Sequence, residues 1–408
     1  MDERLRLGAE GYSPTLLRMI VSQGGRYAFK EAAHNLKELA GVELSAQHVL
    51  RLTERIGREW AAQRDRQIEA FKQGDLARTY TQSPEAAAVM LDGGRGQTRQ
   101  EPSAPGVTQP AWHEPKYGCF QTLDTPVREV DPQPDPPAKF VDPERTPKLV
   151  QQIQSVRSAT KPREESPKKK SRRKGRKRGP RHCRHLVRTV VATMAGVEDF
   201  GFQVATEVYR RGLDLASRKA CVCDGQASNW SVYEEHLKGE GFVAILDFLH
   251  LLTYLYAAAQ ALGGCEAERW KRYVQWVTWA WQGQREKVLV ALNAACARVG
   301  APRSDTPESD PRCVMKKART YVMNNAEKMD YPRYRRLGLP IGSAPVESVI
   351  KQFNKRVKGT EKFWRKSAVE EVLQIRAAQL SEDGREERLW STPRKTRAAP
   401  SNALRGVA

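Results

Sequence analysis

Hydrophobic residues change their spacing near residue 86, which divides the chain into a helical part and a part that alternates strands with helices. Before that point, apolar positions recur at helical spacing over 29–40 and 46–56. A turn at Gly41 separates these segments, and Ser45 is placed to cap the second helix. The outline fits a DNA-binding helix-turn-helix and an ordinary αα-hairpin equally well. In the first case, the exposed face of the second helix carries Gln47, His48, Arg51 and Arg55.

Short apolar runs after residue 86 predict strands, because each is bounded by residues that favour turns. Five such runs cover 86–92, 116–124, 186–194, 219–224 and 241–248. Helices are predicted between the later runs, then over 251–335 with tryptophans that indicate core packing, and finally over 346–358 and 366–380. This order predicts an α/β fold with a mixed sheet and helices on both faces, for which the ribonuclease-H-like sheet is the obvious candidate.

The same pattern predicts the domain organisation. We expect a helical, helix-turn-helix-like DNA-binding region over residues 1–80 and a catalytic domain over 86–380. Within the latter, residues 125–180 are rich in Pro and charge and predict a basic flexible insertion, whereas 251–335 form an all-helical insertion. Residues 381–408 are polar and charged, which predicts a disordered basic tail.

The charge of the chain indicates a polyanionic partner. Lys and Arg number 69 against 48 Asp and Glu, a formal net charge of +21, and nucleic acid is the commonest partner of such a chain. The alternative is a soluble protein with basic tails. Between residues 168 and 178 a basic run is suited to phosphate binding through counterion release, without sequence reading. Its members are Lys168, Lys169, Lys170, Arg172, Arg173, Lys174, Arg176, Lys177 and Arg178.

The cysteines and the start of the chain indicate a reducing compartment. Seven cysteines without a CxxC pair fit neither a disulfide framework nor a complete zinc site, and the run His182–His185 is too short to close one. The first residues are charged, so we expect no signal peptide and a cytoplasmic, nucleoid-associated protein. The apolar stretch 242–262 contains Asp247 and His250, which favours a buried strand and helix over a membrane span.

Three carboxylates are placed for metal chemistry. Asp92 and Asp224 each end an apolar run and precede a glycine, which lets the backbone turn sharply at a sheet edge. Glu347 opens a helix after a Pro- and Gly-containing turn. Two Mg²⁺ or Mn²⁺ ions prefer such oxygen ligands, with Asp92 bridging both ions and the other two carboxylates holding one each. On spacing alone this triad is a hypothesis, because an Asp beside Gly is often only a turn former.

Longer motifs strengthen that hypothesis. Most of the chain carries, in one order, the segments LDGGRGQTR, PKYGCFQTL, FGFQVATEVYRRGLDLA, CVCDGQASNW, ILDFLHLLTYL and GLPIGSAPVESVIKQFNKRVKGTEKFW. Together they resemble bacterial insertion-sequence transposases of the ISKra type, relatives of the Mutator-like Asp-Asp-Glu enzymes. The resemblance implies a ribonuclease-H-like domain with a helical insertion before the glutamate, and Mg²⁺-dependent cleavage and transfer of double-stranded DNA ends. It places the catalytic positions on Asp92, Asp224 and Glu347.

Two further residues match the family around the second aspartate. Asp247 and His250 fit a Cys/Asp-x-x-His motif. They are interpreted either as a pair that supports the metal ligands or as a buried Asp bonded to its neighbouring His. A rival assignment makes Asp247 the second metal ligand in place of Asp224, although only Asp224 is followed by the glycine that a sheet edge favours.

Residues after Glu347 are candidates for contacting DNA. Arg356 and Lys358 follow it on the same predicted helix and are suited to hold the scissile phosphate. Trp364 stands at a family tryptophan position, where it would stack on a base or simply pack. Because two element ends must be joined, we expect at least a dimer on DNA.

Departures from the family leave alternatives open. Family members usually begin with a Cys-rich, zinc-ribbon-like segment, which this sequence lacks, so DNA-end recognition is less well supported than catalysis. One alternative is a catalytically inactive or domesticated DNA-binding derivative, which would bind DNA without metal-dependent cleavage. Another is a structure-specific nuclease on the same fold, which would nick without joining strands. A third is an RNA-binding protein with a basic linker.

Overall fold

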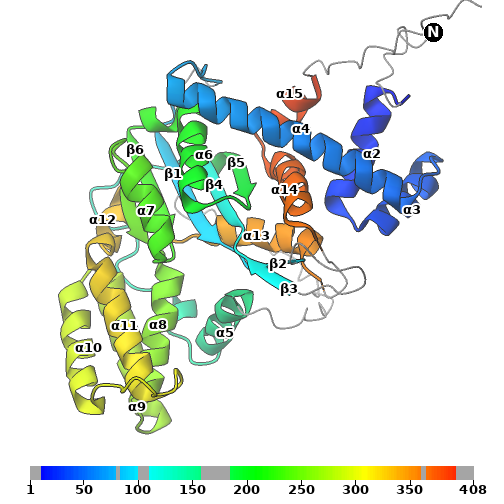
Figure 1. Cartoon of the computed structure of the whole chain (residues 1–408). Coiled ribbons are helices and arrows are strands. Elements are labelled where there is room, and N and C mark those ends of the chain that lie inside the picture. The colour runs from blue at the N-terminus through cyan, green and yellow to red at the C-terminus, as the bar shows by residue number, and fades with distance from the viewer. Residues whose placement is uncertain (1–10, 80–82, 100–109, 158–183, 360–363, 392–408) are drawn as a thin grey trace, which may run out of the picture.

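A computed structural model describes residues 11–79, 83–99, 110–157, 184–359 and 364–391. Its centre is a five-stranded mixed sheet with the strand order β5-β4-β1-β6-β7 (Figure 1). The strands are β1 Ala86–Gly93, β4 Lys116–Asp124, β5 Arg184–Thr193, β6 Arg218–Cys223 and β7 Val243–Leu246. β4 is antiparallel to β1 and β5, whereas β6 is parallel to both β1 and β7. The predicted α/β class and the mixed sheet are confirmed.

Helices cover both faces of the sheet because its strands are apolar on both sides. Successive residues of a strand point to opposite faces, and Val89 and Met90 of β1 accordingly belong to different buried cores. One face is covered by α6 Val197–Arg210 and α7 Ala227–His236, and the other by α8 Phe248–Ala261, α13 Ala344–Val357 and α14 Lys366–Leu380. Residues at the carboxyl ends of β1 and β6 line a cavity between these layers, whereas Asp247 after β7 is buried.

Along the chain, a group of helices follows α8 and precedes α13, over the segment predicted as an all-helical insertion. Its members are α9 Glu266–Trp281, α10 Arg285–Val299, α11 Pro311–Asn325, the short η3 Ala326–Lys328 and α12 Tyr331–Arg336. Figure 1 shows α11 beside α8. Trp276 and Trp281 are buried, and Trp270 and Trp279 pack against the same core, so these tryptophans are core residues as predicted. No helix in the described part of the chain is long and apolar enough to cross a membrane.

The N-terminal helices share a core with the sheet domain. They are α2 Pro14–Arg26, α3 Phe29–Ala40 and α4 Ala46–Gln73, and α4 continues well beyond the predicted end at Ile56. The predicted cap is confirmed, since Ser45 Oγ accepts a hydrogen bond of 3.1 Å from the His48 amide. α14 packs along α4, where a Cβ on Gly57 would collide with the Glu371 backbone. Glycine at this position therefore allows the two helices to approach closely.

Part of the segment predicted as a flexible insertion is folded. A turn of η1 Ala138–Phe140 is followed by α5 Arg145–Arg157, and Phe140, Val150 and Ile153 are buried. The Tyr273 hydroxyl donates to the Phe140 carbonyl. The prediction is wrong for residues 125–157, because a few apolar side chains among many polar ones suffice to dock the segment on α8. The nine basic residues between 168 and 178 lie outside the described residues.

The segment predicted as a disordered tail is also folded in part. Helix α15 Arg385–Ser391 follows α14, and the side chain of Asp383 is buried between them. Its carboxylate accepts hydrogen bonds from Arg385, Arg210 and Thr189. The prediction is wrong for residues 381–391, because buried ion pairs compensate their polarity, and residues 392–408 lie outside the described part. Burial raises the pKa of Asp383, but Arg385 and Arg210 outweigh it and hold that pKa well below the ordinary value.

Two other pieces complete the fold. A small hairpin of β2 Gly96–Arg99 and β3 Pro110–His113 extends from the end of β1, and η2 Leu213–Leu215 links α6 to β6. The hairpin is joined to the chain before α14 by the amide of Arg99, which donates to the Trp364 carbonyl over 2.8 Å. The hairpin therefore lies beside the end of α13 rather than in the central sheet.

Replacing Asp383 with Asn tests the folded tail. At pH 7 we expect the free energy of unfolding to fall by about 3–5 kcal/mol, because Arg210 and Arg385 lose a buried counter-charge. The folded-state pKa of Asp383 lies below 3.8, so this stabilisation is present above that pH and is lost as the pH falls through the folded pKa. Urea unfolding of wild type and variant should therefore converge in acid.

Glu387→Gln is the matched control in the same segment. Glu387 pairs with Arg18 at an exposed site, so its loss should cost less than about 1 kcal/mol at any pH. An Asp383→Asn protein as stable as wild type at neutral pH would show that residues 381–391 contribute nothing to the fold.

Candidate active site

Three aspartates meet at one edge of the sheet because of the strand register. Leu91 of β1 pairs with Cys223 of β6, and Cys223 pairs in turn with Leu246 of β7. An aspartate follows each of these three paired residues in the sequence. Asp92, Asp224 and Asp247 therefore lie side by side at the carboxyl ends of the strands. Parallel strands bring equivalent ends together, so this juxtaposition follows from the pairing alone.

Hydrogen bonds fix the orientation of the first two aspartates. Asp92 Oδ1 accepts from the Gly93 amide over 2.8 Å. Asp224 is buried, and its Oδ1 accepts from the Gln226 amide over 3.0 Å and from Asn229 Nδ2 over 3.2 Å. Asp224 is therefore held at the turn after β6, as the sequence predicted, whereas Asp92 still lies within β1, which continues through Gly93.

Gly225 is required by the turn after Asp224. Its φ of 95° lies in the left-handed region, and an added Cβ would come within 2.5 Å of the Tyr321 ring. The Tyr321 hydroxyl donates to the Asp224 carbonyl over 2.7 Å, and the ring stacks on Tyr254 with centroids 3.8 Å apart. Burial, and then the nearby Asp224, raises the pKa of Tyr321 well above its usual value, so this hydroxyl remains a donor.

Glu347 reaches the same place from the other layer. It lies in the first turn of α13, with Pro345 near the helix start, and is 9% exposed. Asp92, Asp224 and Glu347 line one cavity of about 380 Å³. The structure thus brings together the three carboxylates that the sequence singled out, although they lie far apart along the chain.

Cations line this cavity together with the carboxylates. Lys358 is half-buried there, and burial followed by the neighbouring Arg95 lowers its pKa. The guanidinium of Arg95 lies 4.3 Å from the ring centroid of Trp112, on the β2-β3 hairpin. An acidic centre with cations at its margin suits a substrate that carries both phosphate charge and bound metal ions.

Both carboxylate oxygens of Asp247 accept hydrogen bonds from protein donors. As N-cap of α8, its Oδ1 accepts from the amides of Leu249 and His250, over 2.6 and 3.3 Å. Its Oδ2 accepts from the amide of Ser343 over 2.7 Å and from the Ser343 hydroxyl, and lies 3.4 Å from His250 Nδ1. Burial raises the pKa of Asp247, but His250 and Ser343 outweigh it and lower the pKa overall.

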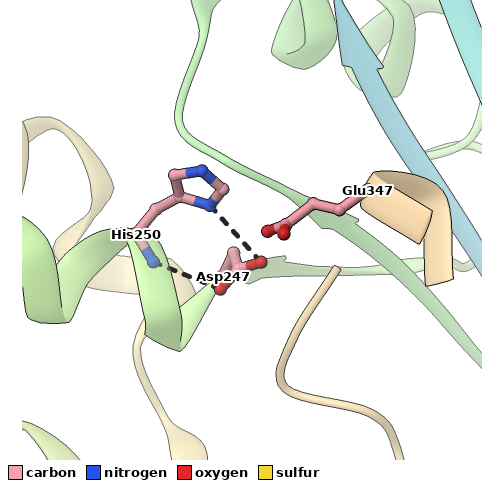
Figure 2. A group of neighbouring side chains, drawn as sticks. All are labelled: Asp247, His250 and Glu347. Carbon is pink, nitrogen blue, oxygen red and sulfur yellow. Dashed lines mark hydrogen bonds and ion pairs between the residues drawn. The ribbon is translucent and has the colours of Figure 1, made fainter. Parts of the chain in front are cut away.

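His250 and Glu347 lie next to this buried carboxylate. Figure 2 shows Glu347 pointing toward Asp247 and His250, and ligand atoms of the three residues lie within 4.8 Å of one another. His250 lines the cavity with Glu347, whereas Asp247 is 0% exposed and is not among the described lining residues. Two sets of ligands are therefore available to Glu347: Asp92 and Asp224 across the cavity, and Asp247 with His250 beside it.

The donor set fits hard divalent cations. Asp92, Asp224 and Glu347 offer carboxylate oxygens from three different elements around one cavity, which is the ligand type that Mg²⁺ and Mn²⁺ prefer. The cavity is far larger than a single water requires, which leaves room for the waters that Mg²⁺ retains. These three residues could hold such ions together.

The predicted DNA-binding residues of α4 are only partly available. Gln47 and Arg51 are exposed, as a DNA-contacting face requires. His48 is half-buried, and its Nε2 is hydrogen-bonded to the Tyr12 hydroxyl over 3.2 Å. Arg55 is half-buried too and lies 3.8 Å from Glu59. Of the four predicted residues on this face of α4, only Gln47 and Arg51 are exposed, so fewer side chains are available to DNA than the helical spacing predicted.

Two residues predicted to contact DNA close to Glu347 do not line the candidate active site. Arg356 is 1% exposed and lines a different cavity, so it does not hold a phosphate beside Glu347. Trp364 is buried, with its Nε1 donating to the Val357 carbonyl over 2.9 Å and its ring edge-on to Phe29, so it packs rather than stacks on an exposed base. Both are covered by the N-terminal helices, a contact that local spacing cannot reveal.

Several residues that line the cavity were not singled out from the sequence. Arg95 follows Asp92 closely within the LDGGRGQTR motif, so its position gave a usable signal. Glu114, exposed at the cavity margin, accepts from Gln226 Nε2 over 2.9 Å. Tyr254 and Tyr321 come from the helical segment, where nothing in the pattern set them apart from core aromatics.

Two substitutions, Asp224→Asn and Asp247→Asn, distinguish a metal ligand from a supporting residue. The free energy of unfolding of each variant is first compared with that of wild type in the absence of metal. Asp247→Asn should lower the free energy of unfolding by about 3 kcal/mol, because an amide NH₂ would face backbone donors in a buried site. Asp224→Asn should change it by less than about 1 kcal/mol, since it keeps an acceptor and removes repulsion among the carboxylates.

Thermal unfolding with added Mn²⁺ completes this test. The ion should raise the melting temperature of wild type and of Asp247→Asn, but not that of Asp224→Asn. Equal destabilisation by both substitutions, with Mn²⁺ still stabilising Asp224→Asn, would reverse the assignment of the two aspartates.

Comparison with known proteins does not assign a family. The chain matches no protein-family model and no curated protein. The functional argument therefore rests on the geometry of the site.

Proposed function

We propose that this protein is a transposase that cleaves double-stranded DNA and transfers the freed strand ends. One observation carries the proposal: Asp92, Asp224 and Glu347, from two neighbouring strand ends and a distant helix, line a single cavity. The chain's charge of +21 supports a polyanionic substrate for this acidic centre. The resemblance to ISKra-type transposases singles out the same three residues.

The sheet supports a ribonuclease-H-like fold. Three antiparallel strands, β5, β4 and β1, are followed by the parallel strands β6 and β7. The first two carboxylates lie at adjacent strand ends, and a helical segment precedes the helix that bears Glu347. This is the arrangement that the resemblance implies for the catalytic domain.

Asp92, Asp224 and Glu347 would hold two Mg²⁺ or Mn²⁺ ions. When bound, such ions lower the pKa of a water nucleophile and stabilise the leaving oxygen. The protein's own part is to keep the carboxylates oriented, which the amides of Gly93 and Gln226 do for the two aspartates. Asp247 holds the start of α13 through the amide of Ser343, which fixes the backbone that carries Glu347.

The reaction proceeds as two displacements at phosphorus. In the first, water attacks a phosphodiester at the element end, the P–O3′ bond breaks, and O3′ takes a proton to become a free 3′-OH. In the second, that 3′-OH attacks a target phosphodiester, and one P–O3′ bond forms while another breaks. Lys358 and Arg95, at the cavity margin, are placed to hold the phosphate in position. Joining two ends at one target requires at least a dimer on DNA, and we place this activity at the bacterial nucleoid.

A cleavage and joining assay tests the proposal directly. The substrate is duplex DNA carrying the flanking element ends, with Mg²⁺ or Mn²⁺. Asp92→Asn, Asp224→Asn and Glu347→Gln should each retain DNA binding but lose more than about a hundredfold in rate. His250→Ala should lose about 10–100-fold, as expected for a residue that positions a ligand.

Glu114→Gln is the matched control for the triad. It removes a carboxylate from the margin of the same cavity, and its rate should stay within about threefold of wild type because the residue is exposed and bonded to Gln226. Nicked products without joined strands would indicate a structure-specific nuclease. DNA binding without any metal-dependent cleavage by wild type would reject the enzymatic proposal in favour of a DNA-binding derivative.

Arg51→Ala tests the contribution of α4 to DNA binding. Arg51 is exposed, and losing one phosphate contact should weaken duplex binding several-fold for all sequences and reduce the salt slope by about one. Fluorescence anisotropy over a range of salt concentrations measures both quantities. Arg298→Ala, which removes an exposed charge from α10, should change neither, and equal losses in the two variants would argue against a specific role for α4.

A further inference from the structure

A second cavity, of about 440 Å³, lies between the N-terminal helices and the end of α13. Gln47 of α4, Arg99 of β2, Arg356 of α13 and Arg365 before α14 contribute to its lining. None of its described lining residues also lines the candidate active site. The cavity is therefore a separate feature, formed where three parts of the chain that are distant in sequence meet.

Arg356 is the central residue of this cavity. It is 1% exposed, and its Nε donates to the Gly24 carbonyl over 2.9 Å. The guanidinium lies 4.4 Å from the ring centroid of Phe29 and 4.8 Å from that of Trp364. Its buried Nη2 has no hydrogen-bond partner among the residues that the structure describes. A strong donor is thus held in a fixed place, with the N–H groups of Nη2 left to donate to a ligand.

The charge of Arg356 is not balanced by the described protein around it. Burial, and then the neighbouring Arg376, lowers the pKa of Arg356 to about 10, so the side chain is still a cation at pH 7. No carboxylate in the described ranges pairs with it. An uncompensated buried cation is costly, and such groups persist where a ligand supplies the counter-charge.

The rest of the lining is also positive on balance. Arg99 and Arg365 are exposed and contribute two more guanidinium groups. Glu54 is the one carboxylate in the described lining, where burial raises its pKa and Arg58 and Arg365 oppose that shift. Three cations against one carboxylate favour an anion, and guanidinium groups present the planar donors that match phosphate oxygens.

We propose that this cavity binds a phosphate group of the DNA backbone, with Arg356 as the central ligand and Arg99 and Arg365 at the opening. The identity of the phosphate as DNA rests on the proposed function. Gln47 supports this source, because it lies on the exposed face of α4 and lines the same cavity.

Binding here has a consequence for the active site. Arg356 and Glu347 lie on one helix, nine residues and about 13 Å apart along its axis. A phosphate held by Arg356 fixes the far end of the helix that carries Glu347. DNA contact at the N-terminal helices is thereby coupled to the position of a metal ligand.

The first experiment measures thermal unfolding in sodium phosphate and in sodium chloride of equal ionic strength. Both solutions contain EDTA, so that no metal ion is bound. Phosphate should raise the wild-type melting temperature by about 3–5 °C. Arg356→Met should melt at or above wild type in chloride, because an apolar side chain between Phe29 and Trp364 removes the uncompensated charge. Arg356→Met should also lose most of the rise in melting temperature that phosphate causes. Arg298→Met should keep that rise, and it is the control for general effects of the salt.

The second experiment measures duplex DNA binding by anisotropy, again in EDTA so that no strand is cut. Arg356→Met should weaken binding about tenfold, with Arg356→Lys intermediate because it keeps the charge without the planar donors. Arg99→Gln, an exposed position that leaves the core intact, should weaken binding about threefold and reduce the phosphate effect. This variant keeps the test decisive if Arg356→Met fails to fold.

Distinct results would overturn the proposal. If Arg356→Met melts below wild type in both salts and Arg99→Gln binds DNA normally, Arg356 only supports the fold. If the phosphate effect disappears while DNA affinity is unchanged, the site takes a free anion and not the DNA backbone. Because both experiments exclude metal, they stand whether or not the protein cleaves DNA.

Discussion

The buried carboxylate of Asp247 holds the candidate active site together. It caps α8, binds the amide and hydroxyl of Ser343 just before α13, and lies against His250. The start of the helix that bears Glu347 is thereby tied to the end of β7, and the sheet register fixes β7 beside the strand that ends at Asp224. Through these hydrogen bonds, the carboxylate of Asp247 holds a sheet edge and a distant helix together at one site.

An acidic cavity within a strongly basic chain explains how the site would meet its substrate. The net charge of +21 attracts a polyanion over a distance, whereas the clustered carboxylates would repel it without a bound cation. The cations at the margin, Arg95 and Lys358, reduce that repulsion where the phosphate would lie. Charge would therefore act in two ways. The net positive charge of the whole chain would attract the polyanion, and bound metal ions would neutralise the carboxylates of the cavity where the phosphate lies.

The N-terminal helices are part of the same structural unit as the sheet. α4 packs along α14, and Arg356 at the end of α13 bonds to the Gly24 carbonyl of α2. A helix-turn-helix-like region on a flexible tether would bind DNA independently of catalysis. Under the proposed function, α13 would link the two, because one helix carries Glu347 at its start and Arg356, bonded to α2, at its end.

The sequence by itself determined the five strands of the central sheet and most helices, and it singled out the three carboxylates, since apolar runs ending at Asp-Gly and a Pro-started helix are local signals. It did not predict the β2-β3 hairpin, whose short strands have no such apolar run. It did not determine that Asp224 faces the cavity while Asp247 is buried, because both are aspartates at strand ends and only contact with Ser343 separates them. The local polarity of residues 125–157 and 381–391 likewise led to wrong predictions of a flexible insertion and a disordered tail. A few buried side chains and ion pairs hold both segments against the rest of the protein. Tertiary structure decided these points, because burial and pairing depend on residues far away in the chain.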